Sequence, residues 1–310
     1  MSEYKSETVS IKVEGLSKIY STQKAIDNIS FEAMEGQITG LVGPNGAGKS
    51  TTMKILTASL TADAGEAYIC GLNVTDEEMR VKSMIGYLPE HNPLYPTMYV
   101  KEFLTFIAKI HKLKNISKRV DEVIEAVGLT KEKHKKISSL SKGYRQRVGI
   151  AQAIIHDPKV LILDEPISGL DPNQIQEIRQ LILKLKENKT IIFSSHILQE
   201  VESICDKIVI LNDGLIVADD ELSHLHKDHS QAIIIELELL NSMDEKAFLS
   251  IESDINFIKS DDNHFVIEVV SGNDIREVIF DRVVADGNKI LSMAMQKKNL
   301  EKLFKSVTKV

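Results

Sequence analysis

Short apolar segments alternate with amphipathic segments along the first two thirds of the chain. The segment 159–163 is apolar after its first residue, as expected for a parallel strand that is covered on both faces. Similar runs occupy 38–42 and 190–194, and a further strand is predicted within 83–92. Helical periodicity is found at 51–60, 100–113, 117–128, 141–156, 174–187 and 197–204. This alternation predicts an α/β sheet flanked by helices.

The pattern changes after about residue 225. The segments that follow predict strand (232–240), helix (243–252), strand (255–259), strand (264–270), helix (273–285), strand (289–296) and helix (298–307). This order predicts a small ferredoxin-like α+β domain. We therefore predict two domains, 1–225 and 226–310. His224, His226 and His229 lie at the junction, where we interpret them as part of a polar connector, with a metal site as the alternative.

Composition narrows the class of protein. The chain has 310 residues, of which 43% are hydrophobic, so it can build an ordinary core. Its formal net charge of −7 gives no general attraction to nucleic acid or to an anionic bilayer, and we expect no nucleic-acid partner. Two distant cysteines, Cys70 and Cys205, suit a reducing compartment. Because neither a secretory signal nor an apolar run of membrane-spanning length is present, we expect a cytoplasmic protein that reaches a membrane only through a partner.

A glycine-rich segment lies between a predicted strand and a predicted helix. Such a loop lets backbone N–H groups surround phosphate oxygens, and the helix N-terminus attracts the same anion. Lys49 is expected to reach the β- and γ-phosphates, and the Ser50 hydroxyl to occupy one Mg²⁺ position. The sequence therefore predicts a nucleoside triphosphate site formed by Gly43, Pro44, Asn45, Gly46, Ala47, Gly48, Lys49, Ser50 and Thr51.

Two carboxylates follow the apolar strand at 159–163. Ligands collect at the carboxyl edge of open α/β sheets, which places Asp164 and Glu165 near the phosphates. We expect Asp164 to hold Mg²⁺ and Glu165 to orient the attacking water. An acidic pair that only caps the strand end is the alternative.

The segment Leu140–Arg147, Leu-Ser-Lys-Gly-Tyr-Arg-Gln-Arg, resembles the signature sequence of the ATP-binding cassette (ABC) ATPases, usually LSGGQ. The order of the other motifs is similar to that family as well, with Ser168-Gly169-Leu170-Asp171 as the D-loop and His196 as the switch histidine. The resemblance covers residues 9 to about 225. It implies a P-loop cassette of mixed sheet and flanking helices with a helical signature subdomain, followed by the small α+β domain.

The resemblance also implies roles for individual residues. Glu165, His196, Lys49 and Asp171 would act in hydrolysis. Ser141, Lys142 and Gly143 would approach the γ-phosphate. Tyr20 would lie against adenine, although ordinary packing also explains an aromatic residue there.

Two motifs depart from the family pattern. The signature has Lys142 and Tyr144 where the family has glycine and glutamine, which adds a cation near the phosphate. Glu90 stands where the Q-loop glutamine is expected. A carboxylate can still accept a hydrogen bond from metal-bound water, but its charge should raise the pKa of Asp164 or Glu165.

One P-loop and one signature in a single chain imply a second copy or a related ATP-binding chain, because two cassettes enclose each ATP in this family. The resemblance implies ATP and Mg²⁺ as cofactors and a multi-span membrane permease as partner, with the chain peripheral on the inner face of the membrane. The segment Glu90–Phe106 would lie near the groove for the permease, or else form local core. The chain is most similar to the exporter-type (ABC-2) subgroup, and within it to the gliding-motility ATP-binding subunit.

Two other functions remain open at this point. A P-loop kinase for small molecules needs the first motif but has no use for the signature, the D-loop or the switch histidine. A soluble ABC ATPase acting on DNA or ribosomes typically has two cassettes or long coiled coils, which this acidic chain lacks.

Overall fold

The computed structural model describes residues 8–223, 233–249, 255–271 and 273–297. The chain forms two compact units, Met1–Asp220 and Glu221–Val310. The helix predicted at 298–307 and the histidines at 224, 226 and 229 lie outside the described residues. Within the described ranges, no group of three or more His, Cys, Asp or Glu side chains is arranged to hold a metal ion.

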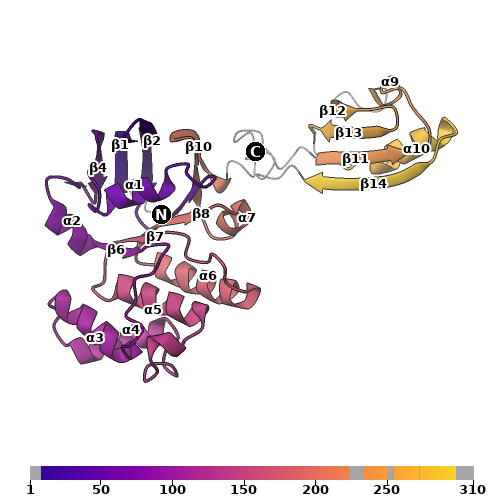
Figure 1. The fold of residues 1–310 in the computed structure, drawn as a ribbon. Helices are drawn as coiled ribbons and strands as arrows, with labels where there is room; N and C mark the ends of the chain where they lie inside the picture. Colours follow the sequence, from indigo (N-terminus) through magenta and orange to yellow (C-terminus); the bar gives the residue numbers. More distant parts are fainter. Residues whose placement is uncertain (1–7, 224–232, 250–254, 272, 298–310) are drawn as a thin grey trace, which may run out of the picture. The chain divides into compact units, whose positions relative to one another are not determined.

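The first unit contains an antiparallel sheet in the order β2-β1-β4-β5 (Figure 1). Its strands are β1 (Val9–Tyr20), β2 (Gln23–Met34), β4 (Ala64–Ile69) and β5 (Leu72–Asn73). Buried and exposed positions alternate along much of β1 and β2, as expected for a sheet with one face on the core. Strands β4 and β5 were not predicted from the sequence.

A second sheet of six strands has the order β10-β9-β3-β8-β7-β6. Its strands are β3 (Ile38–Val42), β6 (Ile85–Leu88), β7 (Val160–Leu163), β8 (Thr190–Ser195), β9 (Lys207–Asn212) and β10 (Leu215–Glu221). Neighbours from β9 to β6 pair in parallel, and every residue of β3, β7 and β8 is buried. The predicted α/β sheet is therefore confirmed.

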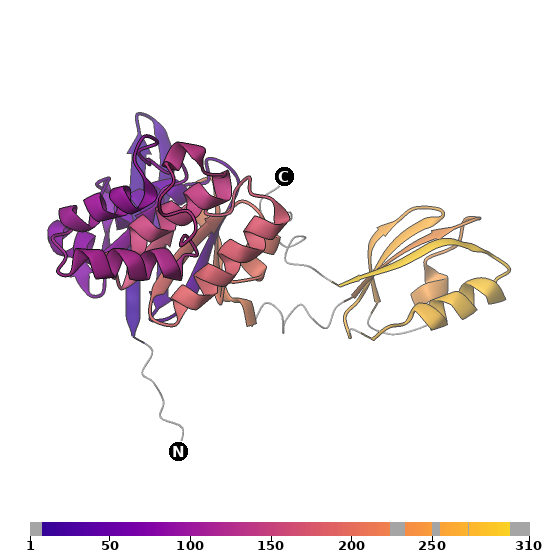
Figure 2. The ribbon, with the colours of Figure 1, turned by 90° about the horizontal axis from the view of Figure 1, so that it is seen from below.

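Helices flank this sheet and also form a separate subdomain (Figures 1 and 2). The helices are α1 (Lys49–Leu56), α2 (Glu78–Met84), α3 (Val100–Ile110), α4 (Ile116–Ala126), the 3₁₀ turn η1 (Ile137–Ser139), α5 (Lys142–Ile154), α6 (Pro172–Lys186) and α7 (Leu198–Glu202). Helices α3, α4 and α5 contact one another and make up the helical subdomain. Its helix α5 also packs on β6, so the signature segment is joined to the sheet.

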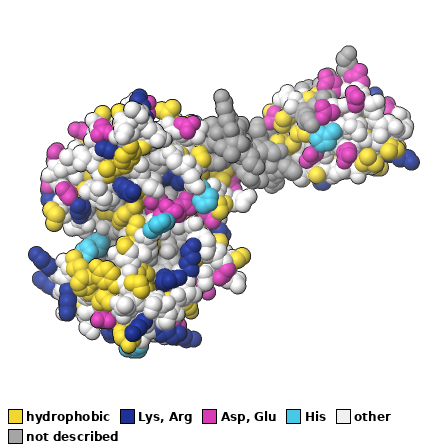
Figure 3. All heavy atoms as spheres, viewed as in Figure 1, with side chains coloured by type: hydrophobic (Ala, Val, Ile, Leu, Met, Phe, Trp, Pro, Cys, Tyr) yellow, Lys and Arg dark blue, Asp and Glu magenta, His cyan; other side chains and the backbone are white. Residues whose placement is uncertain are grey.

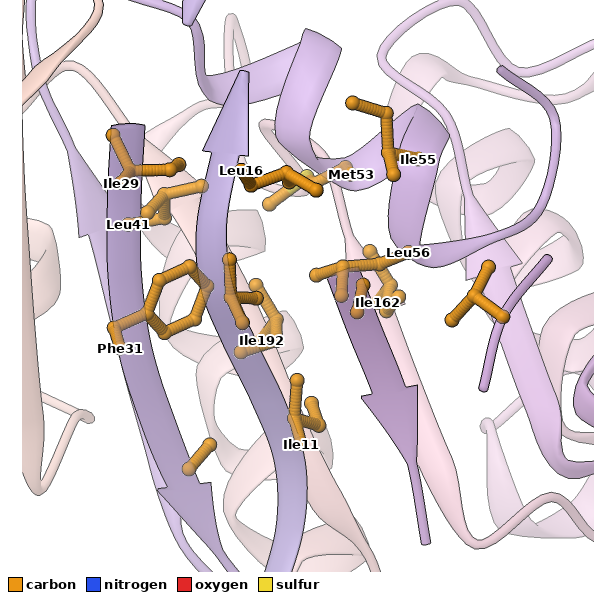
Figure 4. Packing of buried hydrophobic residues seen from close by; sticks show 14 of the residues in the cluster. Ile11, Leu16, Ile29, Phe31, Leu41, Met53, Ile55, Leu56, Ile162 and Ile192 are labelled. Carbon is orange, nitrogen blue, oxygen red and sulfur yellow. The ribbon is translucent and has the colours of Figure 1, made fainter. Parts of the chain in front are cut away.

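One apolar cluster joins the two sheets through α1 (Figure 4). Met53, Ile55 and Leu56 of α1 belong to this cluster, and Figure 4 shows Met53 beside Leu16 of β1 and Leu56 beside Ile162 of β7. Burial of such side chains stabilises the fold by roughly 1.5–3 kcal/mol each. The helix that begins at Lys49 is thus anchored by its apolar face, which fixes its N-terminus at the sheet edge.

The second unit has a four-stranded antiparallel sheet in the order β12-β13-β11-β14. Its elements are β11 (Ile233–Leu239), α9 (Lys246–Leu249), β12 (Ile255–Ser260), β13 (His264–Val269), α10 (Arg276–Ala285) and β14 (Ile290–Lys297). Both helices follow a strand and precede the next one, which is the split βαβ arrangement of ferredoxin-like domains. The fold predicted for this region is confirmed. Helix α9 begins at Lys246 rather than at residue 243, and residues 250–252 of the predicted helix 243–252 lie outside the described residues.

Candidate nucleotide-binding and hydrolysis site

The predicted site residues follow strands that are neighbours in the six-stranded sheet. Val42, the end of β3, pairs with Ser195, the end of β8. Leu163, the end of β7, pairs with Phe193 on β8 and with Leu88 on β6. Because these strands are parallel, the loops that follow them meet at one carboxyl edge. This topology brings the glycine-rich loop, the acidic pair, His196 and Glu90 together.

Glycine is required at two positions of the loop between β3 and α1. A Cβ at Gly43 would collide with the Leu211 carbonyl oxygen on the neighbouring strand β9. Gly48, the N-cap of α1, has a φ of 106°, and a Cβ there would lie 2.6 Å from the Ala25 carbonyl oxygen. These glycines let the loop fold tightly against β9 and β2 and leave the helix N-terminus open toward the site.

Lys49 is the first residue of α1, and its side chain is buried. Its ammonium donates to the carbonyl oxygens of Gly43 (2.7 Å) and Pro44 (3.1 Å) and lies 4.0 Å from Glu165 Oε1. Burial lowers the pKa of Lys49, and the charges of Glu165, Asp164 and Glu90 oppose that shift. A buried cation held by the loop itself is ready to meet an anion placed over the loop.

A cavity of 450 Å³ opens over the loop. Its lining residues are Asn45, Gly46, Ala47, Gly48, Lys49, Ser50, Thr51, Glu90, Glu165, Ser168 and His196. The cavity therefore unites residues predicted to bind phosphate with residues predicted to act in hydrolysis. Ser168, at the start of the D-loop segment, was not predicted as a site residue.

Asp164 and Glu165 lie directly after β7, as predicted. Asp164 is 2% exposed, and its Oδ1 accepts a hydrogen bond of 2.8 Å from the Ser194 hydroxyl. The backbone N–H of Glu165 donates to that same Ser194 oxygen at 2.8 Å. Ser194 was missed, although two serines at the end of a buried strand were a visible signal.

Glu165 Oε2 lies 2.9 Å from His196 Nδ1, so the two residues form a pair. Burial raises the pKa of Glu165, and His196 and Lys49 oppose the shift, while Asp164 adds to it. A raised pKa was expected from Glu90, but burial is its main cause. Glu90 lines the same cavity. Its charge opposes the lowering of the Lys49 pKa and adds to the rise that burial causes in the pKa of Tyr87, to about 12.

Tyr20 lies at the end of β1 and does not line the cavity. Its ring is 47% exposed, with the Lys18 ammonium 6.0 Å from its centroid. An exposed ring is available for stacking on a base, and the adenine-binding role stays a prediction.

The signature residues lie apart from this cavity. Ser141 and Gly143 line a separate hollow of 150 Å³ together with Gln174. Ser141 is the N-cap of α5, and its side chain accepts from the Tyr144 N–H. A Cβ at Gly169 would collide with the Lys142 ammonium, so Lys142 lies over the D-loop of its own chain. Asp171 caps α6 by accepting from the Gln174 N–H at 2.9 Å.

Comparison with known proteins places these motifs in a family. The ABC transporter family model matches residues 26–168. The ATP-binding protein YdbJ of Bacillus subtilis, an uncharacterized ABC transporter protein, is 38% identical over 85% of this chain and 84% of its own length. The linearmycin resistance ATP-binding protein LnrL of the same organism is 32% identical over 96% and 98%. The bacitracin transport ATP-binding protein BcrA of Bacillus licheniformis is 38% identical over 73% and 74%.

Solved structures agree with the fold of the first unit. The cbiO1 protein of Clostridium perfringens, part of an ABC transporter complex, is 30% identical with a TM-score of 0.66, and the match covers 72% of this chain and 92% of that chain. The dimeric cassette MJ0796 is 27% identical with a TM-score of 0.63 and covers 68% and 98%. A second MJ0796 structure holds ADP and Pi after hydrolysis. Among the described residues, none of the helices has the length and apolar character needed to cross a bilayer.

Proposed function

The chain belongs to the ABC transporter ATP-binding proteins, a family of ATP hydrolases, and we propose that it powers an exporter by ATP-driven closure of two cassettes. The observation that carries this proposal is the cavity that Lys49, Glu165 and His196 line together. Phosphoryl transfer to water requires positioning and charge stabilisation more than covalent chemistry. Lys49 binds phosphate, Glu165 accepts a proton from the attacking water, and His196 holds Glu165 in place.

The residues at the sheet edge fit a magnesium ion. The ion prefers oxygen ligands, and the Ser50 hydroxyl and the Asp164 carboxylate supply them. Asp164 has one oxygen engaged by Ser194, which leaves the other for the metal or its water. When bound, Mg²⁺ would neutralise phosphate charge, while Glu90 faces the same cavity and would accept from a metal-bound water.

A second cassette would complete the site. Ser141 and Gly143 line a separate hollow, so one chain supplies the phosphate-binding half and the signature half in different places. A head-to-tail pair would place the signature of one copy over the ATP of the other. The pairing of cassettes in MJ0796 supports a second copy or a related chain as the partner.

An apolar patch on the helical subdomain supports a membrane partner. Tyr95, Tyr99, Phe106 and Ile110 are exposed, and hydrophobic side chains gather on this part of the unit (Figure 3). Tyr95 packs on Phe106 at 5.8 Å between ring centroids. Val100 and Phe103 are buried beneath, so the segment Glu90–Phe106 contributes both to local core and to this surface. We propose that a cytoplasmic segment of a multi-span permease docks here.

Export is the direction we propose. The relative named for linearmycin resistance supports it, because removing a toxic compound from the cell is one way to resist it. A link to gliding motility rests on the sequence resemblance and stays a prediction. Membership of the family argues against the small-molecule kinase, which has no use for a signature, and leaves the ABC ATPase without a permease as the alternative.

Purification of tagged Glu165→Gln with ATP from gently solubilised native membranes tests this proposal. We expect a multi-span membrane protein in stoichiometric amount. A homodimer without a membrane chain, under conditions that keep known transporters intact, would favour the alternative.

The apolar patch gives a second prediction. Phe106→Asp should reduce recovery of the membrane protein about tenfold or more, because it puts a charge into an apolar contact, while ATP hydrolysis by the isolated chain stays within about twofold. Met79→Asp on α2, which also replaces an exposed hydrophobic side chain, is the matched control and should recover the partner normally. Equal recovery with both variants would place the docking surface elsewhere.

A further inference from the structure

The hydroxyl of Ser194 lies between the two carboxylate residues of the site. Ser194 belongs to β8, next to β7, and is fully buried, with 0% exposure. Its oxygen accepts the Glu165 N–H at 2.8 Å, and its hydrogen goes to Asp164 Oδ1, also at 2.8 Å. An N–H group can only donate, so the hydroxyl is left with its own hydrogen for the carboxylate. Ser194 therefore donates its one hydroxyl hydrogen to Asp164, and its oxygen accepts the hydrogen of the Glu165 N–H.

The bond to Glu165 holds an unusual backbone. Glu165 has a φ of 49°, in the left-handed region that a residue with a Cβ rarely adopts. Such a conformation persists when the surroundings fix it. The Ser194 oxygen fixes it from the neighbouring strand and so directs the Glu165 side chain toward His196, 2.9 Å away.

The bond to Asp164 sets the orientation of that carboxylate. With Oδ1 held by Ser194, rotation of the carboxylate about its terminal bond is restricted and the second oxygen keeps one direction. Without the Ser194 hydroxyl, Asp164 Oδ1 would lose its hydrogen-bond donor while the carboxylate stayed buried, and an unsatisfied buried acceptor is unfavourable. Ser194 thus acts on both carboxylates through one atom.

We propose that Ser194 is a positioning residue that fixes the metal-facing oxygen of Asp164 and the strained backbone of Glu165 at the same time. This inference rests on the proposed function, since it takes Asp164 as the magnesium carboxylate and Glu165 as the base. It predicts that removal of the Ser194 hydroxyl weakens both the Mg²⁺-dependent part of ATP binding and ATP hydrolysis. Phosphate binding by the loop at 43–51 should not be weakened.

Ser194→Ala tests the proposal by separating three quantities. ATP affinity measured in EDTA should stay within about twofold, because the loop and Lys49 are untouched. The gain in ATP affinity on adding Mg²⁺ should fall about tenfold, so KM for Mg-ATP should rise with it. The kcat should fall about tenfold to a hundredfold, as expected for an unsatisfied buried carboxylate and a released backbone.

Two further variants distinguish positioning from packing. Ser194→Cys keeps nearly the same volume but bonds weakly, so it should resemble Ser194→Ala if the hydrogen bonds matter and the wild type if only packing does. Thr190→Val removes a buried hydroxyl from the other end of β8, where it lies 2.9 Å from the Ser10 hydroxyl, and should leave metal dependence and kcat unchanged. Thermal denaturation of each variant verifies folding.

Wild-type metal dependence and kcat in Ser194→Ala would overturn the inference while leaving the proposed function intact. So would an equal loss in Thr190→Val, since the effect would then belong to β8 in general. Wild-type protein that neither hydrolyses ATP nor binds it more tightly with Mg²⁺ would instead overturn the proposed function, and the inference with it.

Discussion

Glu165→Gln is expected to bind ATP with nearly wild-type affinity and to hydrolyse it about 10²- to 10³-fold more slowly, the usual contribution of a general base. Glutamine has a similar shape and can still meet His196 Nδ1, which lies 2.9 Å from Glu165 Oε2. It cannot accept the proton of the attacking water. ATP would then remain between two cassettes, and the variant should accumulate as an ATP-bound dimer.

Single-turnover hydrolysis and analytical ultracentrifugation with and without ATP measure these two effects. Glu35→Gln, a change in an exposed turn before β3, is the control and should hydrolyse ATP and dissociate as the wild type does. Wild-type hydrolysis by Glu165→Gln would remove the role given to this carboxylate, whatever the state of association.

The pKa of Glu165 gives the same residue a pH signature. Glu165 must be ionised to act as a base, and burial raises its pKa above the ordinary carboxylate range. Activity should therefore fall as the pH is lowered through this raised pKa, at a higher pH than for an exposed glutamate.

The stability of the fold should change with pH in the opposite direction. Because the folded-state pKa of Glu165 is raised, ionisation of this residue lowers the free energy of unfolding as the pH rises through that pKa. The nucleotide-free Glu165→Gln variant should thus melt no lower than the wild type at neutral pH, which calorimetry can measure.

The site was largely predictable where a local motif determines the backbone. The loop at 43–51 follows a buried strand and starts a helix, and the cavity above it contains most of its predicted residues. Asp164 and Glu165 were placed by the end of an apolar strand. In each case the chemistry and the fold depend on neighbours in sequence, which pattern analysis detects.

Contacts between strands were harder to predict from the sequence. Ser194 touches Asp164 and Glu165 across 30 and 29 residues of sequence, and the pairing of β7 with β8 creates that contact. The cause of the raised Glu165 pKa was also predicted wrongly. Burial is its main cause, and burial depends on all the residues at the sheet edge, whereas the sequence pointed to the charge of Glu90. Strand β4 begins with three exposed residues, and β5 has only two residues, so neither has a clear apolar pattern.

Lys49→Ala is expected to weaken ATP binding about 10- to 100-fold. The ammonium would lose its charge-assisted hydrogen bonds to phosphate, which contribute roughly 1.5–3 kcal/mol. Isothermal titration or fluorescent-nucleotide binding measures the loss. Lys54→Ala on the same helix removes an exposed lysine and should bind ATP as the wild type does. Unaltered affinity in Lys49→Ala would contradict the phosphate-binding role of the loop.

Thermal stability separates this loss of binding from a loss of folding. Burial lowers the folded-state pKa of Lys49, so the charged ammonium destabilises the protein at neutral pH, and this penalty is relieved as the pH rises through that pKa. Replacing Lys49 removes the penalty, and the nucleotide-free variant should melt close to the wild type or above it. ATP at 100 times the wild-type Kd stabilises the wild type by about 2.7 kcal/mol, and the same concentration should add only about 0.4–1.4 kcal/mol to Lys49→Ala. The unfavourable burial of the Lys49 charge and the stabilisation by ATP therefore have one cause. The loop buries a cation, and the nucleotide would supply the opposite charge.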